Sequence, residues 1–207
     1  MKKGIMALSG MIVTLTFIII AFFGPWYNMD VESSIPGTEM AYSVGMYLTK
    51  MEMKGTIMTK DISMSISYAD AKDQAQTAGI NTDSFKIIDY VNYLMIGMII
   101  TAILALAGMS GYVFNFGKAN TMKMIGFTFG FITFILAMIA PIYFMNNSFT
   151  QGNYGFWFSQ TIVGIKMSAG PGFAWYLMIV AAIIAFISSV AMLLKNSNPE
   201  IVLQSLQ

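Results

Sequence analysis

The sequence of 207 residues contains no cysteine and no histidine, and none of its eleven basic residues is an arginine. Without cysteine the chain has no disulfide, thiol nucleophile or thiolate metal site. Without histidine it lacks the usual ligand of haem, copper and zinc and the usual acid–base group near neutral pH. Without arginine it has no bidentate clamp for phosphate, and the net charge is only +1. We therefore expect no metal, no cofactor, no catalytic residue and no nucleic-acid partner.

Charge is scarce as well. Charged residues make up 10% of the chain, against about 25% in ordinary globular proteins, whereas 57% of the chain is hydrophobic. Gly4 to Phe23 carries no charge and has the length of about 20 residues that a helix needs to cross a bilayer core. Three later runs have the same character. We predict a single membrane domain over 1–207, with spans at 4–23, 91–114, 124–145 and 173–194.

The segment between the first two spans, residues 25–82, is polar enough to leave the membrane. Apolar and polar residues alternate over 27–32, 40–48 and 61–68, a period of two that is typical of half-buried strands. The apolar positions change parity near Thr49-Lys50, which suggests a bulge or bend. Ala69 to Ala78 favours a short surface helix ending at Gly79. We expect an outer β-rich segment.

A second polar segment, residues 146–172, separates the last two spans. Its part from Phe156 to Met167 has strand character. A single strand is not stable alone, and the sheet of the first segment has edges open to pairing. We therefore predict one small antiparallel sheet of about four strands, completed by this strand and placed on the helix bundle.

The lysines indicate the orientation of the spans. One side carries six lysines and nine acids, and the other carries five lysines and a single acid, Glu200. Those five are Lys2, Lys3, Lys118, Lys123 and Lys195. Because positive residues favour the cytoplasmic side, both termini are predicted to be cytoplasmic and both polar segments to lie outside. The sequence thus predicts a multi-pass protein of the plasma membrane.

This arrangement resembles the superfamily of claudins, peripheral myelin protein, epithelial membrane proteins and calcium-channel γ subunits. Trp26 stands just after the first span, where that family has a tryptophan, and Gly45-Met46-Tyr47 stands where it has Gly-Leu-Trp. The two cysteines that bridge adjacent strands in the family are absent. The resemblance implies a membrane α+β fold, a four-transmembrane-helix bundle with a small extracellular antiparallel β-sheet that is claudin-like in topology.

Aromatic residues are dense in the second polar segment, with five between positions 149 and 158. Such a group either forms a surface for a protein partner or packs under the sheet and at the membrane interface. Trp26 and Tyr47, which carry the resemblance, join this hypothetical interaction surface. Its candidates are Trp26, Tyr47, Phe156, Trp157 and Phe158, with Phe149 and Tyr154 in the same group.

The spans offer two further sets of candidates. Small residues at four-residue spacing let helix backbones approach, either within the bundle or against another copy of the chain. Asp89 and Asn92, one turn apart at the outer end of the second span, form either a polar mouth for a cation or a polar ligand, or an ordinary helix end at the membrane interface. The candidates for helix packing are Gly97, Gly126, Gly130, Ala181, Ala185 and Ser189.

Methionine is abundant, with twenty residues. Met51, Met53 and Met58 form an outward group beside Met40 and Met46. Thioethers bind Cu(I), but methionine also fills irregular apolar packing, and packing is the prediction here.

We expect a non-enzymatic integral membrane protein that serves lateral assembly, adhesion or accessory support of a larger membrane complex. The expected partners are the lipid bilayer and either other membrane protein subunits or further copies of the chain. The alternative is a small oligomeric channel or transporter, which requires a water-lined path of residues such as Asn92, Thr101 and Ser110. No span carries a charge in its central part, where transporters usually place one, and this weighs against the alternative.

Overall fold

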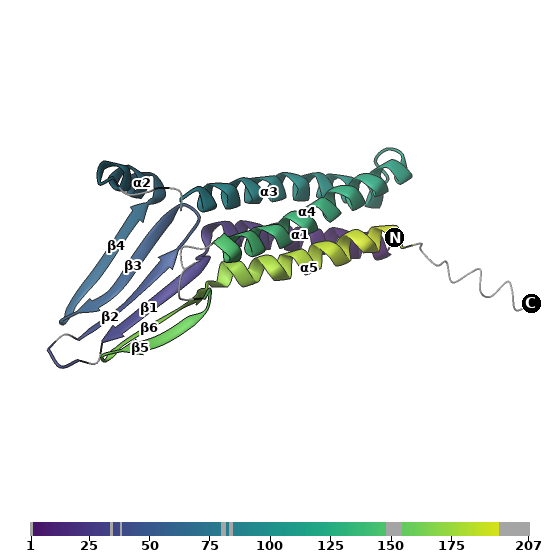
Figure 1. The fold of residues 1–207 in the computed structure, drawn as a ribbon. Coiled ribbons are helices and arrows are strands. Elements are labelled where there is room, and N and C mark those ends of the chain that lie inside the picture. Colours follow the sequence, from purple (N-terminus) through teal and green to yellow (C-terminus); the bar gives the residue numbers. More distant parts are fainter. Residues whose placement is uncertain are drawn as a thin grey trace, which may run out of the picture.

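The computed structural model describes residues 2–33, 35–37, 39–79, 82, 85–147 and 155–194. In these residues a bundle of helices carries an antiparallel sheet at one end (Figure 1). The helices are α1 (Lys2–Phe23), α2 (Tyr68–Thr77), α3 (Phe85–Val113), α4 (Ala119–Asn147) and α5 (Phe173–Leu193). The strands are β1 (Tyr27–Ser33), β2 (Met40–Met46), β3 (Lys50–Ile57), β4 (Lys60–Ser67), β5 (Phe158–Ile162) and β6 (Ile165–Pro171).

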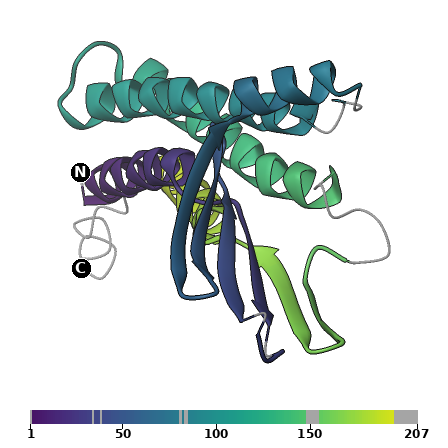
Figure 2. The same cartoon turned by 90° about the vertical axis from the view of Figure 1, so that its left-hand side faces the viewer.

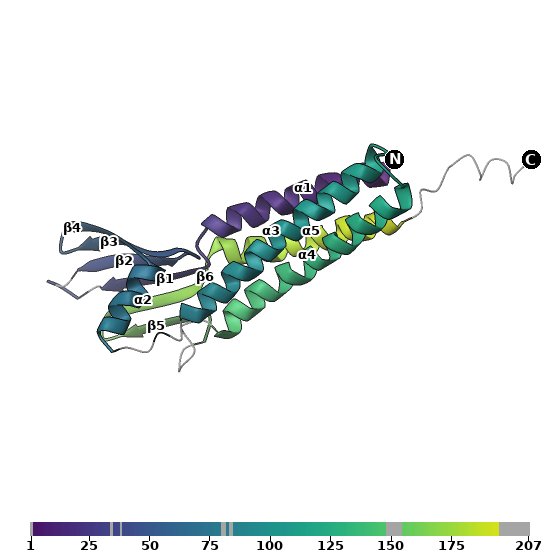
Figure 3. The ribbon, with the colours of Figure 1, turned by 90° about the horizontal axis from the view of Figure 1, so that it is seen from above.

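Four of the helices, α1, α3, α4 and α5, are long and apolar enough to cross a membrane, with mean hydropathies from 2.1 to 2.5. The prediction of four apolar helices is confirmed, and their length and composition are those of a multi-pass membrane protein. They run side by side along the bundle (Figure 3). α1 packs against α3 and α5, and α4 packs against the same two helices.

Close approach of the helices depends on small residues. A Cβ atom added to Gly108 of α3 would lie 2.4 Å from the backbone nitrogen of Gly126 in α4, so the two helices touch through their backbones. About two helical turns from this contact, the hydroxyl of Thr133 donates to that of Thr101 at 2.9 Å and joins α4 to α3. The buried core between the helices is otherwise built mainly of alanine and methionine.

The sheet has the strand order β4-β3-β2-β1-β6-β5, and every neighbouring pair is antiparallel. β6 pairs with β1, so the prediction that the second polar segment joins the sheet of the first is confirmed. The number of strands is six rather than about four. The turns of the β1–β2, β3–β4 and β5–β6 hairpins all lie at the end of the sheet that is farthest from the bundle (Figure 1).

Two interpretations of the sequence were wrong, because each treated two strands joined by a tight turn as a single strand. The two overlooked turns explain the extra strands. The parity change near Thr49-Lys50 is a reversal of the chain and not a bulge, because the Tyr47 amide donates to the Lys50 carbonyl at 2.9 Å and closes a tight β2–β3 turn. The stretch from Phe156 to Met167 is not a single strand. It turns at Val163-Gly164, where both residues have positive φ, and forms the β5–β6 hairpin.

The short helix α2 follows β4 as predicted. Ser67 stands at its N-cap, and the Ser67 hydroxyl oxygen accepts a hydrogen bond from the Asp70 amide at 3.1 Å. Just beyond its C-terminus Gly79 has a φ of +70°, the left-handed conformation that commonly ends helices.

The sheet is joined to the bundle by two adjacent helix–strand connections, α1 to β1 and β6 to α5 (Figure 2). The Gly172 amide donates to the Trp26 carbonyl at 2.9 Å, and the Ala174 amide donates to the Pro25 carbonyl at 3.1 Å. The Trp26 indole N–H donates to the Ala21 carbonyl at 2.9 Å and so satisfies a carbonyl of the last turn of α1. A Cβ atom on Gly172 would lie 2.1 Å from the Pro25 carbonyl oxygen.

Substituting Gly172→Ala should therefore force the two connections apart. Overpacking of this kind typically costs about 1–3 kcal/mol, and here the obstacle is backbone, which cannot rotate away. We expect a clear fall in the Tm of the detergent-solubilised protein, measured by differential scanning fluorimetry. Gly97→Ala is the matched control, since its new Cβ would meet only Leu136 at an ordinary 3.6 Å. Equal Tm values for the two variants would contradict this account of the junction.

Candidate interaction surface

The register of the ladders separates the sheet into two chemically different faces. On β1, Tyr27, Met29 and Val31 lie on one face, and Asn28, Asp30 and Glu32 lie on the other. The register of the five ladders places many methionines on the same face as Tyr27, Met29 and Val31, and we call it the methionine face. Its methionines are Met29, Met40, Met46, Met51, Met53, Met64 and Met167.

One apolar row of the methionine face crosses the whole sheet. The ladder partners place Phe158 opposite Ala169, Ala169 opposite Met29, Met29 opposite Val44, Val44 opposite Met53 and Met53 opposite Met64. Close to the bundle this face is covered, and Met46 and Met51 pack against the core. Toward the edges it is open, since Met64 is 65% exposed and Ile162 is 41% exposed.

The opposite side, which we call the polar face, carries serine, threonine, lysine and acids. Here Asp30, Ser43, Lys54 and Lys166 border an open hollow of about 400 Å³ that spans four strands. Lys166 Nζ lies 3.6 Å from a carboxylate oxygen of Glu32, and both side chains are more than half exposed. Such a pair is a solvated surface contact of little energetic weight.

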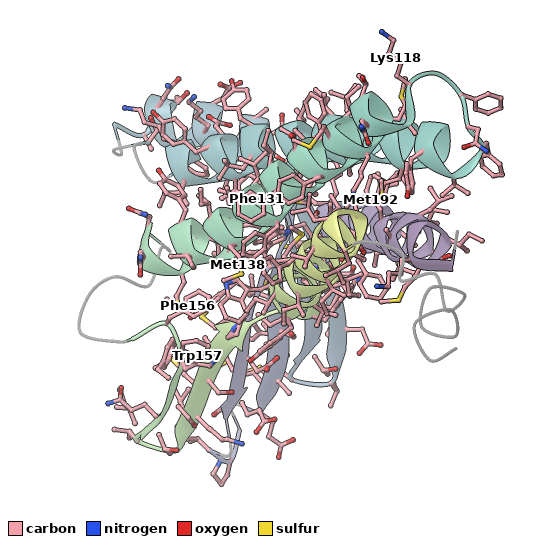
Figure 4. All side chains as sticks on the ribbon, turned by 90° about the vertical axis from the view of Figure 1, so that its right-hand side faces the viewer. Lys118, Phe131, Met138, Phe156, Trp157 and Met192 are labelled. Carbon is pink, nitrogen blue, oxygen red and sulfur yellow. The ribbon has the colours of Figure 1, made fainter. Side chains whose placement is uncertain are left out.

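Aromatic rings bring the hairpin β5–β6 against the bundle. The ring of Phe156 lies 5.2 Å from that of Tyr27 and 5.9 Å from that of Trp175, between centroids. Trp157 stands edge-on to Phe156 at 4.9 Å and remains 54% exposed. Figure 4 places Phe156 and Trp157 between α4 and the hairpin. Of the aromatic candidates, Phe149 and Tyr154 lie outside the described residues.

The placement of Trp26 does not fit a contact surface. Its side chain is 0% exposed, packs 5.5 Å from the ring of Phe144 and is held by the bond to the Ala21 carbonyl. Trp26 therefore fastens the sheet to the bundle. Phe156 shares this role in part, because its ring is packed against the rings of Tyr27, Phe144 and Trp175. Trp157 has the exposure that a contact residue needs, and Phe158 lies half-buried on the methionine face.

Tyr47 belongs to a charged group at the β2–β3 turn. Its hydroxyl donates to a carboxylate oxygen of Glu52 at 3.3 Å, and Glu52 also accepts a hydrogen bond from Lys54 at 3.0 Å. Lys50 pairs with the other carboxylate oxygen and lies 5.4 Å from the centre of the Tyr47 ring. The hydrogen bond from Lys50, and to a smaller extent that from Lys54, lowers the pKa of Glu52 from 4.5 to about 2. The hydrogen bond to Glu52 in turn raises the pKa of Lys54.

The two candidates for a polar mouth take different roles. Asp89 is exposed, whereas Asn92 donates from Nδ2 to the Leu48 carbonyl at 2.9 Å and ties α3 to the β2–β3 turn. Nearby, the hydroxyl of Tyr68 is buried without a partner among the described residues, and this burial raises the pKa of Tyr68. Of the residues expected on a water-lined path, Thr101 is bonded to Thr133 inside the bundle.

The small residues predicted to pack helices lie inside this bundle. Ala181, Ala185 and Ser189 of α5 are each 0% exposed, and a Cβ atom on Gly130 would lie 2.4 Å from the Ser189 hydroxyl. Gly126 faces Met109 of α3, and Gly97 has looser surroundings. Sequence reasoning missed Gly108, because the residues four positions before and after it, Leu104 and Tyr112, are large and leave no four-residue spacing of small residues.

Among the described residues no group of three or more histidine, cysteine, aspartate or glutamate side chains could hold a metal ion. No protein-family model matches the sequence, and none of the curated proteins matches it. The class of this protein is thus given by its architecture alone. In the described residues it is a bundle of four apolar, membrane-length helices that carries a six-stranded antiparallel sheet.

Acidification should weaken the charged group at the β2–β3 turn. Because the folded pKa of Glu52 lies below 4.5, the stability that its ionisation provides is complete above pH 4.5, declines toward about pH 2 and is lost below that. We expect the Tm difference between the wild type and Glu52→Gln to be positive at pH 6 and to close between pH 4.5 and 2. A difference that stays constant over this range would refute the assignment. In Lys50→Met the loss should be complete at a higher pH.

Proposed function

We propose that this protein is a non-enzymatic membrane protein that assembles laterally with other membrane protein subunits, as an accessory subunit of a larger membrane complex. The observation that carries the proposal is the apolar row from Phe158 to Met64, which reaches both open edges of the sheet. At the β5 edge the exposed Trp157 directly precedes Phe158 in the chain. Exposed apolar patches of this kind mark interaction sites, and methionine surfaces adapt to the shape of a partner.

The rigid attachment of the sheet supports this proposal. Because α1 continues into β1 and β6 continues into α5, the methionine face keeps a fixed angle to the helices. A partner anchored in the same bilayer therefore meets this face in a single orientation, which lowers the entropy cost of association. The interior hydroxyls of Thr133 and Ser189 bond to their own bundle, an arrangement suited to a scaffold.

The orientation is part of the proposal. Lys3, Lys118 and Lys123 lie at the end of the bundle opposite the sheet, where Lys123 donates to the Leu193 carbonyl at 3.3 Å. Lysines that flank membrane spans favour an orientation in which their end of the bundle lies in the cytoplasm. We therefore place the sheet outside the plasma membrane and the opposite end of the bundle, where α1 begins and α5 ends, inside, in a claudin-like topology without the family's disulfide.

The proposed contact surface is tested by removing two of its side chains, the exposed Trp157 and the adjacent Phe158. In Trp157→Ala/Phe158→Ala we expect at least about a tenfold lower recovery of co-purifying membrane subunits after gentle-detergent isolation, as for the loss of an interface hot spot. The matched control is Phe116→Ala, a ring that is 69% exposed in the loop at the opposite end of the bundle. Native mass spectrometry identifies and counts the subunits.

Unchanged recovery in the double variant, with an unchanged Tm, would remove this surface from consideration. A complex made only of further copies of the chain would replace the accessory role by self-assembly.

A further inference from the structure

Four methionines of the methionine face form two directly opposed pairs on three neighbouring strands. Met46 of β2 stands opposite Met51 of β3, and Met53 of β3 stands opposite Met64 of β4. Met51 and Met53 are two residues apart on the same strand and therefore share the face. The sequence indicated part of this group, but it could not reveal that Met64 completes it, because that depends on the β3–β4 register.

The spacing allows several thioethers to meet at one point. Cβ atoms of directly opposed residues in an antiparallel pair lie about 5 Å apart, and residues two apart on a strand are separated by about 7 Å. A methionine side chain has three rotatable bonds and reaches across such distances. Met51 and Met53 together with either Met46 or Met64 can thus place three sulfur atoms around a single ion.

None of the other methionines of this face stands directly opposite a methionine. Met29 stands between Val44 and Ala169, Met40 between Ser33 and Ile57, and Met167 between Val31 and Gln160. Packing alone would account for methionine anywhere on the face, whereas ligation requires this clustering.

The chemistry of the cluster selects the ligand class. Thioether sulfur is a soft, neutral ligand that prefers Cu(I) among biological metals and has little affinity for Mg²⁺, Ca²⁺ or Zn²⁺. The charged Glu52 and Lys54 alternate with these methionines along β3 and so project from the polar face. The chain contains no cysteine or histidine to compete for a soft cation.

Access and support are both present. Met64 is 65% exposed, which opens the cluster to solvent, whereas Met46 and Met51 are packed against the core and hold their strands in place. We propose that Met46, Met51, Met53 and Met64 form a binding site for a soft monovalent cation, Cu(I), on the sheet. This site goes beyond the proposed assembly function and does not depend on it.

The test is a metal titration of the full-length protein in detergent. Cu(I) is supplied anaerobically with ascorbate and a chromogenic chelator as competitor, and Ag(I) serves as a redox-inert second probe. We expect one tightly bound ion per chain, with X-ray absorption reporting only sulfur neighbours. Met53→Leu/Met64→Leu should weaken binding at least tenfold, because it leaves only two of the four thioethers.

Leucine keeps the apolar volume, so we expect the fold to be preserved, and far-UV circular dichroism and Tm check this. The matched control is Met29→Leu/Met167→Leu, which removes two methionines from the same face and should leave the affinity unchanged. Absence of stoichiometric Cu(I) in the wild type overturns the proposal whatever the variants do. Equal weakening in both double variants, or oxygen and nitrogen neighbours in the absorption spectrum, also overturns it.

Discussion

Two backbone hydrogen bonds, from the Gly172 amide to the Trp26 carbonyl and from the Ala174 amide to the Pro25 carbonyl, fix the sheet against the helices. They form because the chain has no side chain at position 172, where a Cβ atom would collide with the Pro25 carbonyl. The indole of Trp26 then closes the end of α1 and fills the space beside Phe144. The helices α1 and α5 thus connect directly to the neighbouring strands β1 and β6, with β2, β3 and β4 added on one side of this pair and β5 on the other.

A sheet built outward from β1 and β6 needs further support, because the chain has no disulfide to brace it. The structure supplies that support by other means. Asn92 bonds the β2–β3 turn to α3, and Glu52 draws two lysines together on the same hairpin. On the other side of the sheet, Phe156 packs against Tyr27 and Trp175 and holds the β5–β6 hairpin to the bundle. These contacts act at both flanks, where the ladders alone would fray.

Much of this architecture follows from the sequence, since long uncharged runs and strict alternation are strong signals. The four apolar helices, the short helix α2 and the pairing of the second polar segment with the first were predicted. The turns were harder to predict because their residues are unusual. Val163 has a φ of 48° and Met58 a φ of 46°, in positions where glycine or asparagine is the usual signal. The β2–β3 reversal at Tyr47 to Lys50 contains no glycine or proline at all.

The candidate surface was harder to predict than the fold, for a related physical reason. A high density of aromatic residues shows where large rings gather, but it does not show which rings are buried. Trp26 is fully buried, whereas Trp157 is half exposed. The methionine face depends on register, which is set by where each turn falls: a shift of one residue would send the side chains of a strand to the polar face. The turn from Tyr47 to Lys50 returns β3 with Met51 opposite Met46. The chemistry of the sheet is therefore decided by its turns, and a turn without glycine or proline hides that decision from the sequence.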